Sequence, residues 1–357
     1  MTPYLVMYAV VASILLLTSK VVKHQTGYLI FIVLAALFLF AGLRGIVGAD
    51  TGSYLLIYNE LANKDGILSG MSRTEPGFIA LLSLHKAIFN SETLYIIMMS
   101  GFQVFLLYVV VKNSSRQHLF LLCYVFLFYL NFHFNTTRAA IATMLFLYGL
   151  CGKSVTNKRL ALLAAPLFHV TILPFYLVLL RGTNWKHIVA VLGVAGLAIA
   201  LNFEAALLFA TKFLVYQSFG ILEQSGVSLY AVLLTVMALS SIFALKNSGY
   251  YFKWMAGALA VSYLVTNFYP VAFRLTIVAS VFYYFFLIDE LSRTNRSSLQ
   301  LFFWIPVVLG FYFVVIGINN ESKNLNDRIN LGSVPVSALE STYIPYRFSW
   351  NDRRIKN

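Results

Sequence analysis

The sequence has few charged residues. Asp, Glu, Lys and Arg make up only 11% of its 357 residues, whereas a typical soluble domain carries about 25%. Hydrophobic residues account for 60%, and they occur in long runs. Runs of about 18 or more apolar residues are typical of membrane-spanning helices. This composition excludes a soluble domain for most of the chain and predicts an integral membrane protein.

Acidic residues are the scarcer of the two charged types. The chain has 13 Asp and Glu against 26 Lys and Arg, so its formal net charge is +13. On a soluble protein such an excess would suggest a nucleic-acid partner. In a membrane protein the same excess is expected, because short cytoplasmic loops retain Lys and Arg. We therefore expect membrane lipid around the chain and no nucleic-acid partner.

Cysteine is nearly absent, and the usual signatures of metal and nucleotide sites are missing. Cys123 and Cys151 both lie in apolar runs, which is typical of buried, unreactive thiols. No cluster of His, Cys, Asp and Glu has metal-ligand spacing. The sequence also has no P-loop, no Gly-x-Gly-x-x-Gly stretch and no Asp-x-Asp pair. We therefore expect neither a metal ion nor a cofactor.

The apolar runs predict an all-α, polytopic membrane protein. They form a single membrane domain over residues 1–357, with about 10 to 12 transmembrane or re-entrant helices. The full-length candidates are residues 4–19, 28–47, 93–111, 118–133, 136–152, 187–203, 227–245, 254–272, 275–291 and 299–317.

Two further apolar segments do not fit a simple crossing. Residues 76–89 are short and contain His85 and Lys86, and residues 160–180 contain two prolines that bracket His169. A proline inside a helix removes a hydrogen bond and kinks the helix. Broken helices at membrane depth occur where they face protein or a water-filled cavity. The second segment is also long enough for one kinked span, so that alternative stays open.

The distribution of basic loops favours a re-entrant path for both segments. If each returns to the side from which it came, six short basic loops lie on one face, as cytoplasmic loops should. The opposite, external face then carries residues 204–224 as an interfacial helix and residues 318–357 as a C-terminal tail. It also carries Arg44, Arg138 and His169. We therefore expect a functional site on the external face.

Several arginines lie beside apolar segments on this face. Arg138 is at the start of an apolar helix that Asn135 or Thr136 could cap, so the helix N-terminus and the guanidinium together favour an anion. Arg44 precedes Asp50 in a glycine-rich stretch, although an arginine there could also extend to the lipid head groups. The planar fork of arginine donors suits phosphate oxygens. This pattern predicts a site for a lipid-linked phosphate or pyrophosphate.

Two candidate proton acceptors lie beside or within the two segments that do not fit a simple crossing. Glu75 precedes Pro76 and is equally explained as an ordinary acid in the first turn of a helix. His169 lies between two prolines, and a single histidine of this kind is often a hydrogen-bonded structural residue. From the residues alone, both explanations are open in each case.

Five short motifs follow one another along the chain. They are Arg44-x-x-x-Gly48-x-Asp50-x-x-x-Tyr54, Glu75-Pro76-Gly77-Phe78, Asn135-x-x-Arg138, Phe168-His169-x-Thr171 and Tyr343-x-Pro345-Tyr346-Arg347. Their order and spacing resemble the EpsG family of bacterial polysaccharide polymerases, relatives of the Wzy O-antigen polymerases. One position departs from the pattern, since Ala139 follows Arg138 where a glutamine is expected.

The resemblance implies a fold related to the membrane glycosyltransferases that use lipid carriers. It also implies Wzy-type glycosyl transfer, in which a growing chain passes from undecaprenyl pyrophosphate to a new lipid-linked repeat unit. The expected location is the bacterial inner membrane, with the site at its periplasmic face. The expected partners are the lipid-linked donor and acceptor and a protein that regulates chain length.

As a hypothesis for this reaction, we assign three groups of residues. Cationic side chains would neutralise the pyrophosphate leaving group, a base would activate the acceptor hydroxyl, and polar or aromatic side chains would bind sugars. The pyrophosphate-binding candidates are Arg44, Arg73, Arg138, Arg274 and Arg347; the base candidates are Asp50, Glu75 and His169; the sugar-binding candidates are Tyr54, Asn135, Tyr343 and Tyr346.

Three other activities are compatible with an external cationic site. A flippase or transporter of lipid-linked oligosaccharides would be expected to contain inverted repeats with paired broken helices, and the two broken segments here differ in character. A membrane O-acyltransferase would need cytoplasmic access for its acyl donor. An O-antigen ligase uses the same transfer chemistry and differs in its acceptor.

Overall fold

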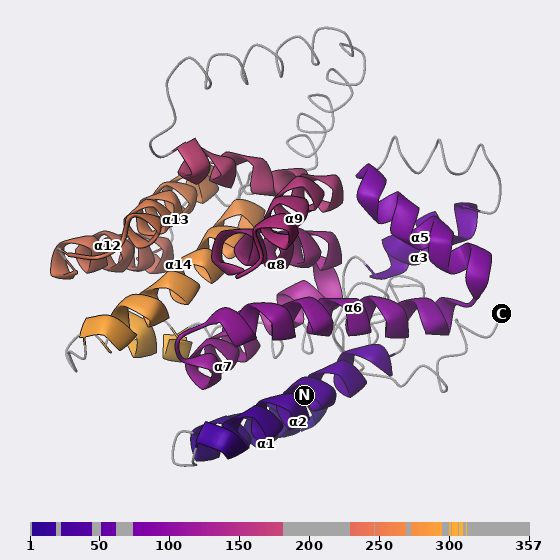
Figure 1. Cartoon of the computed structure of the whole chain (residues 1–357), viewed down its shortest axis with the longest axis horizontal. Helices are drawn as coiled ribbons and strands as arrows, with labels where there is room; N and C mark the ends of the chain where they lie inside the picture. The colour runs from indigo at the N-terminus through magenta and orange to yellow at the C-terminus, as the bar shows by residue number, and fades with distance from the viewer. Residues whose placement is uncertain are drawn as a thin grey trace, which may run out of the picture. The chain divides into compact units, whose positions relative to one another are not determined.

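All secondary-structure elements in the described part of the chain are helices (Figure 1). The computed structural model describes residues 2–18, 23–44, 51–61, 74–180, 229–245, 247–268, 273–294 and some positions between 300 and 312. The chain divides into two compact units, one of residues 1–170 with 287–357 and the other of residues 171–286. The all-α class predicted from the sequence is confirmed.

The first unit is arranged around a long central helix. Its described elements are α1 (Thr2–Thr18), α2 (Lys23–Gly42), α3 (Thr51–Glu60), α5 (Pro76–Ile88), α6 (Glu92–Asn113), α7 (Gln117–Leu127), the π-helix η1 (Asn131–Asn135), α8 (Thr137–Cys151) and α9 (Val155–Phe168). In Figure 1, α6 lies between the α1–α2 pair and the α8–α9 pair, and it contacts α2 and α8. Helix α9 packs along α8 and also contacts α5.

Serine caps fix where two of these helices begin. The side chain of Ser91 accepts a hydrogen bond from the backbone N–H of Leu94 at the start of α6, at 3.4 Å. Ser154 accepts from the N–H of Asn157 in the same way at the start of α9. Each bond satisfies a donor that the first helical turn leaves without a partner in the helix.

Aromatic side chains fill the core of the first unit where α7 leads into η1. The rings of Tyr124, Phe128 and Phe132 lie 6.1–6.2 Å from one another, centroid to centroid. The hydroxyl of Tyr129 donates to the carbonyl oxygen of Leu37 in α2 at 2.6 Å. This packing holds in place the residues that lead into α8.

The second unit contains α12 (Leu229–Ala244), α13 (Tyr250–Phe268) and most of both the 3-10 helix η2 (Val170–Leu180) and α14 (Phe273–Thr294). Helices α12 and α13 pack against each other. The ring of Phe175 meets that of Phe282 edge-on, at 4.9 Å between centroids. Buried serine hydroxyls such as those of Ser241 and Ser280 donate to carbonyl oxygens of their own helices, which satisfies them within an apolar core.

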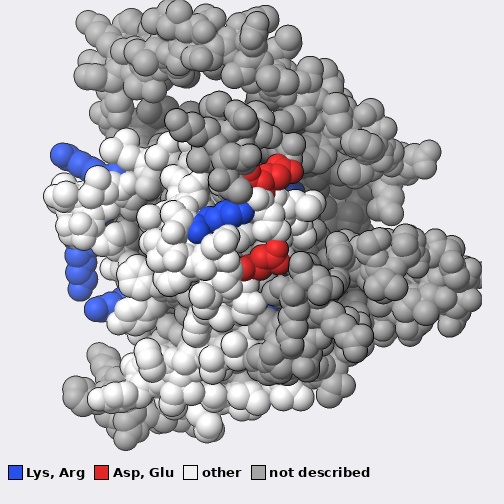
Figure 2. Space-filling model, turned by 90° about the vertical axis from the view of Figure 1, so that its right-hand side faces the viewer, with Lys and Arg blue, Asp and Glu red and all other residues white. Residues whose placement is uncertain are grey.

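Large apolar side chains cover much of the described surface. Tyr28, Leu163 and Phe243 are each at least 70% exposed, although soluble proteins rarely expose large apolar patches. On the face shown in Figure 2, most described atoms belong to uncharged residues and the charged side chains form a few separate groups. Helix α6 and residues Arg274–Thr294 of α14 are long and apolar enough to cross a membrane. The chain is a polytopic membrane protein, as predicted.

Many predicted spans coincide with helices to within a few residues, and two of the differences bear on the candidate site. Within the run predicted at 28–47, helix α2 ends at Gly42, so Arg44 lies beyond the end of this helix. The run predicted at 118–133 is a regular α-helix only to Leu127, and η1 follows over Asn131–Asn135. A π-helix differs from an α-helix by the register of its hydrogen bonds, which an apolar run does not encode.

Residues 76–89 and 160–180, the two segments that did not fit a simple membrane crossing, have different structures. Helix α5 is an uninterrupted 13-residue helix, about 20 Å long, and is therefore shorter than the hydrocarbon core of about 30 Å. The segment 160–180 is broken, because α9 ends at Phe168, His169 is extended (φ −162°, ψ 128°) and η2 follows. The predicted break is confirmed, while a re-entrant path stays a prediction. The segments 187–203, 204–224 and 318–357, for which the sequence predicts a span, an interfacial helix and a tail, lie outside the described residues.

Candidate functional site

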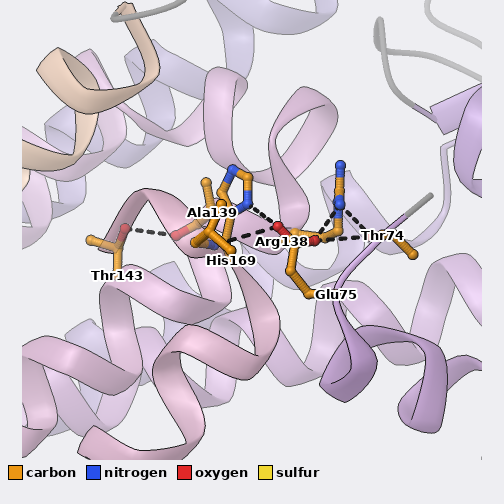
Figure 3. Close-up of polar contacts among 7 residues, drawn as sticks. Thr74, Glu75, Arg138, Ala139, Thr143 and His169 are labelled. Atoms are coloured by element: carbon orange, nitrogen blue, oxygen red, sulfur yellow. Dashed lines mark hydrogen bonds and ion pairs between the residues drawn. The ribbon is translucent and has the colours of Figure 1, made fainter. Parts of the chain in front are cut away.

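Glu75 is the N-cap residue of α5. Its backbone is extended (φ −72°, ψ 145°), and Pro76 occupies the first position of the helix, where a missing N–H leaves no bond unmade. Glu75 is thus an acid at a helix start, as the sequence also allowed, but its side chain makes no capping hydrogen bond. The carboxylate is directed instead toward Arg138 and His169 (Figure 3).

Arg138 reaches this carboxylate from the second position of α8. Its Nη1 donates to Oε2 of Glu75 and to Oγ1 of Thr74. The side chains of Arg138 and Glu75 are only 17% and 11% exposed, so the ion pair is largely shielded. The guanidinium carbon also lies 5.6 Å from the ring centroid of Tyr54 and 5.8 Å from that of Phe78. Aromatic rings in these positions stabilise a partly desolvated cation.

His169 binds the other oxygen of the same carboxylate. Its Nδ1 lies 2.6 Å from Oε1 of Glu75, and the backbone N–H of Val170 donates to that oxygen at 3.4 Å. Three segments distant in sequence therefore meet at Glu75: the start of α5, the N-terminus of α8 and the C-terminus of α9. We call Thr74, Glu75, Arg138 and His169 the Glu75 cluster.

Opposing effects act on the charge of Glu75. Burial raises the pKa of its carboxyl group, but the hydrogen bond from His169 and the positive charge of Arg138 outweigh burial and lower the pKa to about 2. The carboxylate is therefore ionised at neutral pH, and it balances the charge of Arg138.

A close contact between α5 and α9 brings the cluster together. A Cβ on Gly77 would lie 2.8 Å from the carbonyl oxygen of Leu167 and 2.9 Å from its Cβ, so only glycine fits at this approach. Gly77 follows Glu75 by two residues, and Leu167 precedes His169 by two. The crossing thus sets the distance between the carboxylate and the imidazole.

A second arginine, which is buried, lies beside the residues that lead into α8. Arg44 is 5% exposed, and its guanidinium carbon lies 4.6 Å from the ring centroid of Phe134. Its Nη1 donates to the carbonyl oxygen of Ala41 near the end of α2, where a positive charge is favourable. Thr51, the first residue of α3, donates to the carbonyl oxygen of Phe134 at 3.1 Å. Phe134 is four residues before Arg138.

The structure brings together part of the predicted set. Glu75, Arg138, His169 and Tyr54 are joined by direct contacts. Asn135 ends η1, immediately after Phe134, which Arg44 covers. Arg274 belongs to the second unit, where it is half-buried at the second position of α14.

Five predicted site residues lie outside the described part of the chain. They are Asp50, Arg73, Tyr343, Tyr346 and Arg347.

Two members of the site were not identified from the sequence. Thr74 donates from its hydroxyl to Oε2 of Glu75 at 3.0 Å and accepts from Arg138, and its position next to Glu75 was the only available signal. Gly77 lies within a motif that was noted, but its contact with Leu167 is visible only in three dimensions.

Of the two residues predicted as possible caps of α8, Asn135 and Thr136, the side chain of Thr136 does not cap the helix. Thr136 is the N-cap residue, but its side chain makes no capping bond. Its hydroxyl donates instead to the carbonyl oxygen of Asn131 at 3.1 Å, because the π-helical turn places that oxygen within reach. The first turn of α8, which carries Arg138, is therefore not capped by the Thr136 side chain.

The chemistry available in the cluster is anion binding and proton transfer. Arginine binds phosphate and carboxylate oxygens through several donors, and an imidazole next to a carboxylate can accept a proton. Among the residues that the structure describes, no group of three or more His, Cys, Asp and Glu side chains could hold a metal ion.

Residues 27–330 of the chain match the EpsG family. Since this match covers most of the 357 residues, the chain belongs to the EpsG family, which is linked to exopolysaccharide biosynthesis. No curated protein and no solved structure matches the chain. The Glu75 cluster and Arg44 lie inside the matched region, whereas Tyr343, Tyr346 and Arg347 lie beyond it.

Proposed function

We propose that this member of the EpsG family is a polysaccharide polymerase that joins repeat units by glycosyl transfer. In the proposed reaction the growing chain leaves its undecaprenyl pyrophosphate carrier and is transferred to a lipid-linked repeat unit. The observation that carries the proposal is the largely shielded Arg138 at the N-terminus of α8, over the rings of Tyr54 and Phe78. A charged side chain in an apolar helix is costly, and such residues mark functional sites in membrane proteins.

Arg138 is suited to an anionic leaving group. It lies in the first turn of α8, where the helix dipole favours negative charge. Glu75 and Thr74 engage its Nη1, but a guanidinium carries five N–H donors in a planar fork. A pyrophosphate oxygen could therefore bind the same side chain without breaking its pair with Glu75. Arg44 supplies a second cation, which is buried, at Phe134.

The reaction places new negative charge on the pyrophosphate. An acceptor hydroxyl attacks the anomeric carbon of the donor sugar, and the bond to the lipid pyrophosphate breaks. Cationic donors already positioned at the leaving oxygens lower the barrier, because they need no reorganisation as the charge develops. The acceptor hydroxyl must also lose a proton, which requires a base nearby.

Sequence and family membership support further assignments. Arg73, Arg274 and Arg347 would add contacts to the pyrophosphates of donor and acceptor, and tyrosine or asparagine side chains would bind sugars through ring faces and hydrogen bonds. The proposed sugar-binding residues are Tyr54, Asn135, Tyr343 and Tyr346, and the candidate bases are Asp50, Glu75 and His169.

We place the site at the periplasmic face of the bacterial inner membrane. This orientation is supported by the short basic loops, which lie on one face if residues 76–89 and 160–180 are re-entrant. The donor and acceptor would then reach the site from the outer leaflet, and a protein that regulates chain length would act on the same side.

The proposal is tested with the purified protein in liposomes, supplied only with undecaprenyl-pyrophosphate-linked repeat units from the bacterium of origin. We expect a ladder of glycan multiples on a gel without added nucleotide, and no ladder from Arg138→Ala. Arg293→Ala serves as the control, because Arg293 is exposed and pairs within its own helix. A single unextended band from folded wild-type protein would contradict the proposal. Product that forms only after a different acceptor lipid is added would identify a ligase instead.

A further inference from the structure

Both oxygens of the Glu75 carboxylate are fully engaged. Oε1 accepts from Nδ1 of His169 and from the N–H of Val170. Oε2 accepts from the hydroxyl of Thr74 and from Arg138. A carboxylate offers about four lone-pair sites, and four donors already occupy them. A sugar hydroxyl would have to displace one of these donors before it could give a proton to Glu75.

The low basicity of Glu75 is a second argument against its acting as the general base. Burial raises the pKa of this carboxyl group, but His169 and Arg138 together bring it down to about 2. A general base is most effective when its pKa lies near the working pH. Glu75 is therefore a weak proton acceptor at neutral pH, whereas it is a strong partner for neighbouring cations.

The contact with Glu75 also sets the tautomer of His169. An ionised carboxylate can only accept hydrogen bonds, so the short contact at Nδ1 requires a proton on that nitrogen. The neutral ring then carries its lone pair on Nε2. A carboxylate behind an imidazole holds the ring in this tautomer and stabilises the imidazolium that forms when Nε2 takes a proton.

We propose that His169 is the base that accepts the proton of the acceptor sugar hydroxyl, and that Glu75 is a positioning residue. This assignment rests on the glycosyl transfer proposed above. Nε2 takes the proton, and the electron pair of the hydroxyl oxygen forms the new bond to the anomeric carbon of the donor. The bond from that carbon to the pyrophosphate oxygen breaks, and its electron pair leaves on the pyrophosphate. The imidazolium then returns its proton to the leaving group or to water.

The backbone holds the imidazole in place for this role. His169 directly follows the end of α9, and its N–H donates to the carbonyl oxygen of Ala165 at 3.3 Å. Gly77 lets α5 approach Leu167 closely enough for the carboxylate to reach the ring. Glu75 also holds Arg138 on its second oxygen. One carboxylate therefore fixes the spacing between the base and the cation that would face the leaving group.

The test compares transfer rates over a range of pH for wild type, His169→Gln and Glu75→Gln, with the undecaprenyl-pyrophosphate-linked repeat unit as substrate. The wild-type rate should fall on acidification as the imidazole becomes protonated. His169→Gln should be about 10²- to 10⁴-fold slower, and its rate should no longer fall on acidification; this fall is called the acid limb of the pH profile. Glu75→Gln should also be slower, by up to about 10⁴-fold. Its rate should still fall on acidification, but at lower pH than in wild type, because the imidazolium has lost its carboxylate.

A matched control and a binding measurement separate this role from a structural one. His118→Gln, in the first turn of α7, should keep the wild-type rate and pH profile. His169→Gln should bind the lipid-linked repeat unit within about threefold of wild type, since the base acts on the proton and not on the pyrophosphate. Failure of His169→Gln to bind the repeat unit would overturn the assignment. So would a transfer rate that still falls on acidification in His169→Gln but no longer does so in Glu75→Gln.

The outcomes also distinguish this inference from the proposed function. A ladder from wild type with His169→Gln still within fivefold of its rate overturns the assignment of the base and leaves the polymerase intact. A wild type that forms no ladder overturns both. If His169→Gln does not fold, the pH profile of Glu75→Gln tests the assignment instead. A rate that falls at the same pH as in wild type would show that the carboxylate does not act on the titrating base, and would overturn the assignment.

Discussion

Gly77 and Leu167 touch where α5 crosses α9, and each lies two residues from one partner of the Glu75–His169 pair. The backbone contact and the side-chain contact therefore depend on each other. Any side chain at position 77 would push the two helices apart and would separate the carboxylate from the imidazole.

The first prediction concerns this crossing. Gly77→Ala should destabilise the protein by about 1–3 kcal/mol, because the new methyl group meets backbone atoms that cannot move aside. Thermal unfolding in detergent would show a lower Tm, and the polymerisation rate should fall as the Glu75 cluster opens.

Gly257→Ala is the matched control for Gly77→Ala. A Cβ at Gly257 in α13 meets nothing within 4 Å, so this substitution should be neutral or slightly stabilising through helix propensity. Equal Tm values for the two variants would contradict the role given to the crossing.

The second prediction separates charge from geometry at Arg138. Arg138→Lys keeps the positive charge but loses the fork that serves Glu75, Thr74 and the proposed pyrophosphate at once. Transfer activity should fall by about 100-fold or more. Arg293→Lys should stay within about twofold of wild type, because exposed ion pairs contribute little. Full activity of Arg138→Lys at normal protein level would remove Arg138 from the site.

The third prediction follows from the lowered pKa of Glu75. Its folded-state pKa of about 2 lies below the ordinary value of 4.5, so the carboxylate contributes stability that is complete above about pH 4.5 and is lost as the pH falls toward 2. The wild-type Tm should thus drop on acidification below about pH 5. Glu75→Gln should start from a lower Tm at neutral pH and should drop less.

Glu92→Gln is the control for the acid dependence. Glu92 bonds to Asn59 at an exposed position, and this variant retains Glu75, so its Tm should follow the wild-type curve. If Glu75→Gln and wild type showed parallel curves, the ion pairs of Glu75 would not contribute to stability.

The fourth prediction tests Thr74. Thr74→Val keeps the shape of the side chain but removes the hydroxyl that donates to Glu75 and accepts from Arg138. Each of these two hydrogen bonds to a charged group contributes about 1.5–3 kcal/mol. Their loss would lower the Tm and reduce transfer by about tenfold or more. Thr74→Ser restores the hydroxyl and should recover most of the rate. A Thr74→Val variant as active as wild type would show that the hydroxyl has no role in transfer.

The membrane fold could be predicted because it depends on composition and run length. Apolar runs located helices such as α6 and α8 closely, since a spanning helix must satisfy its backbone internally. The π-helix at Asn131–Asn135 and the end of α2 before Arg44 could not be predicted in this way. Both depend on local hydrogen-bond register and on tertiary contacts of single residues.

The candidate site could be predicted as a set of residues but not as an arrangement. Arg138, Glu75 and His169 were identified because charge and imidazole beside apolar segments are costly to keep. Their convergence on a single carboxylate depends on the crossing at Gly77, between segments about 90 residues apart. No local pattern encodes that contact, and the same absence of a local signal explains why Thr74 was missed.

The most direct test of the proposed polymerase is the ratio of lipid pyrophosphate released to glycosidic bonds formed. Purified protein in liposomes would receive labelled undecaprenyl-pyrophosphate-linked repeat units, and free carrier and extended glycan would be counted in the same sample. We expect one carrier released for each bond formed by wild type, and neither product from Arg138→Ala. Movement of intact lipid-linked units across the bilayer, with no carrier released, would contradict it.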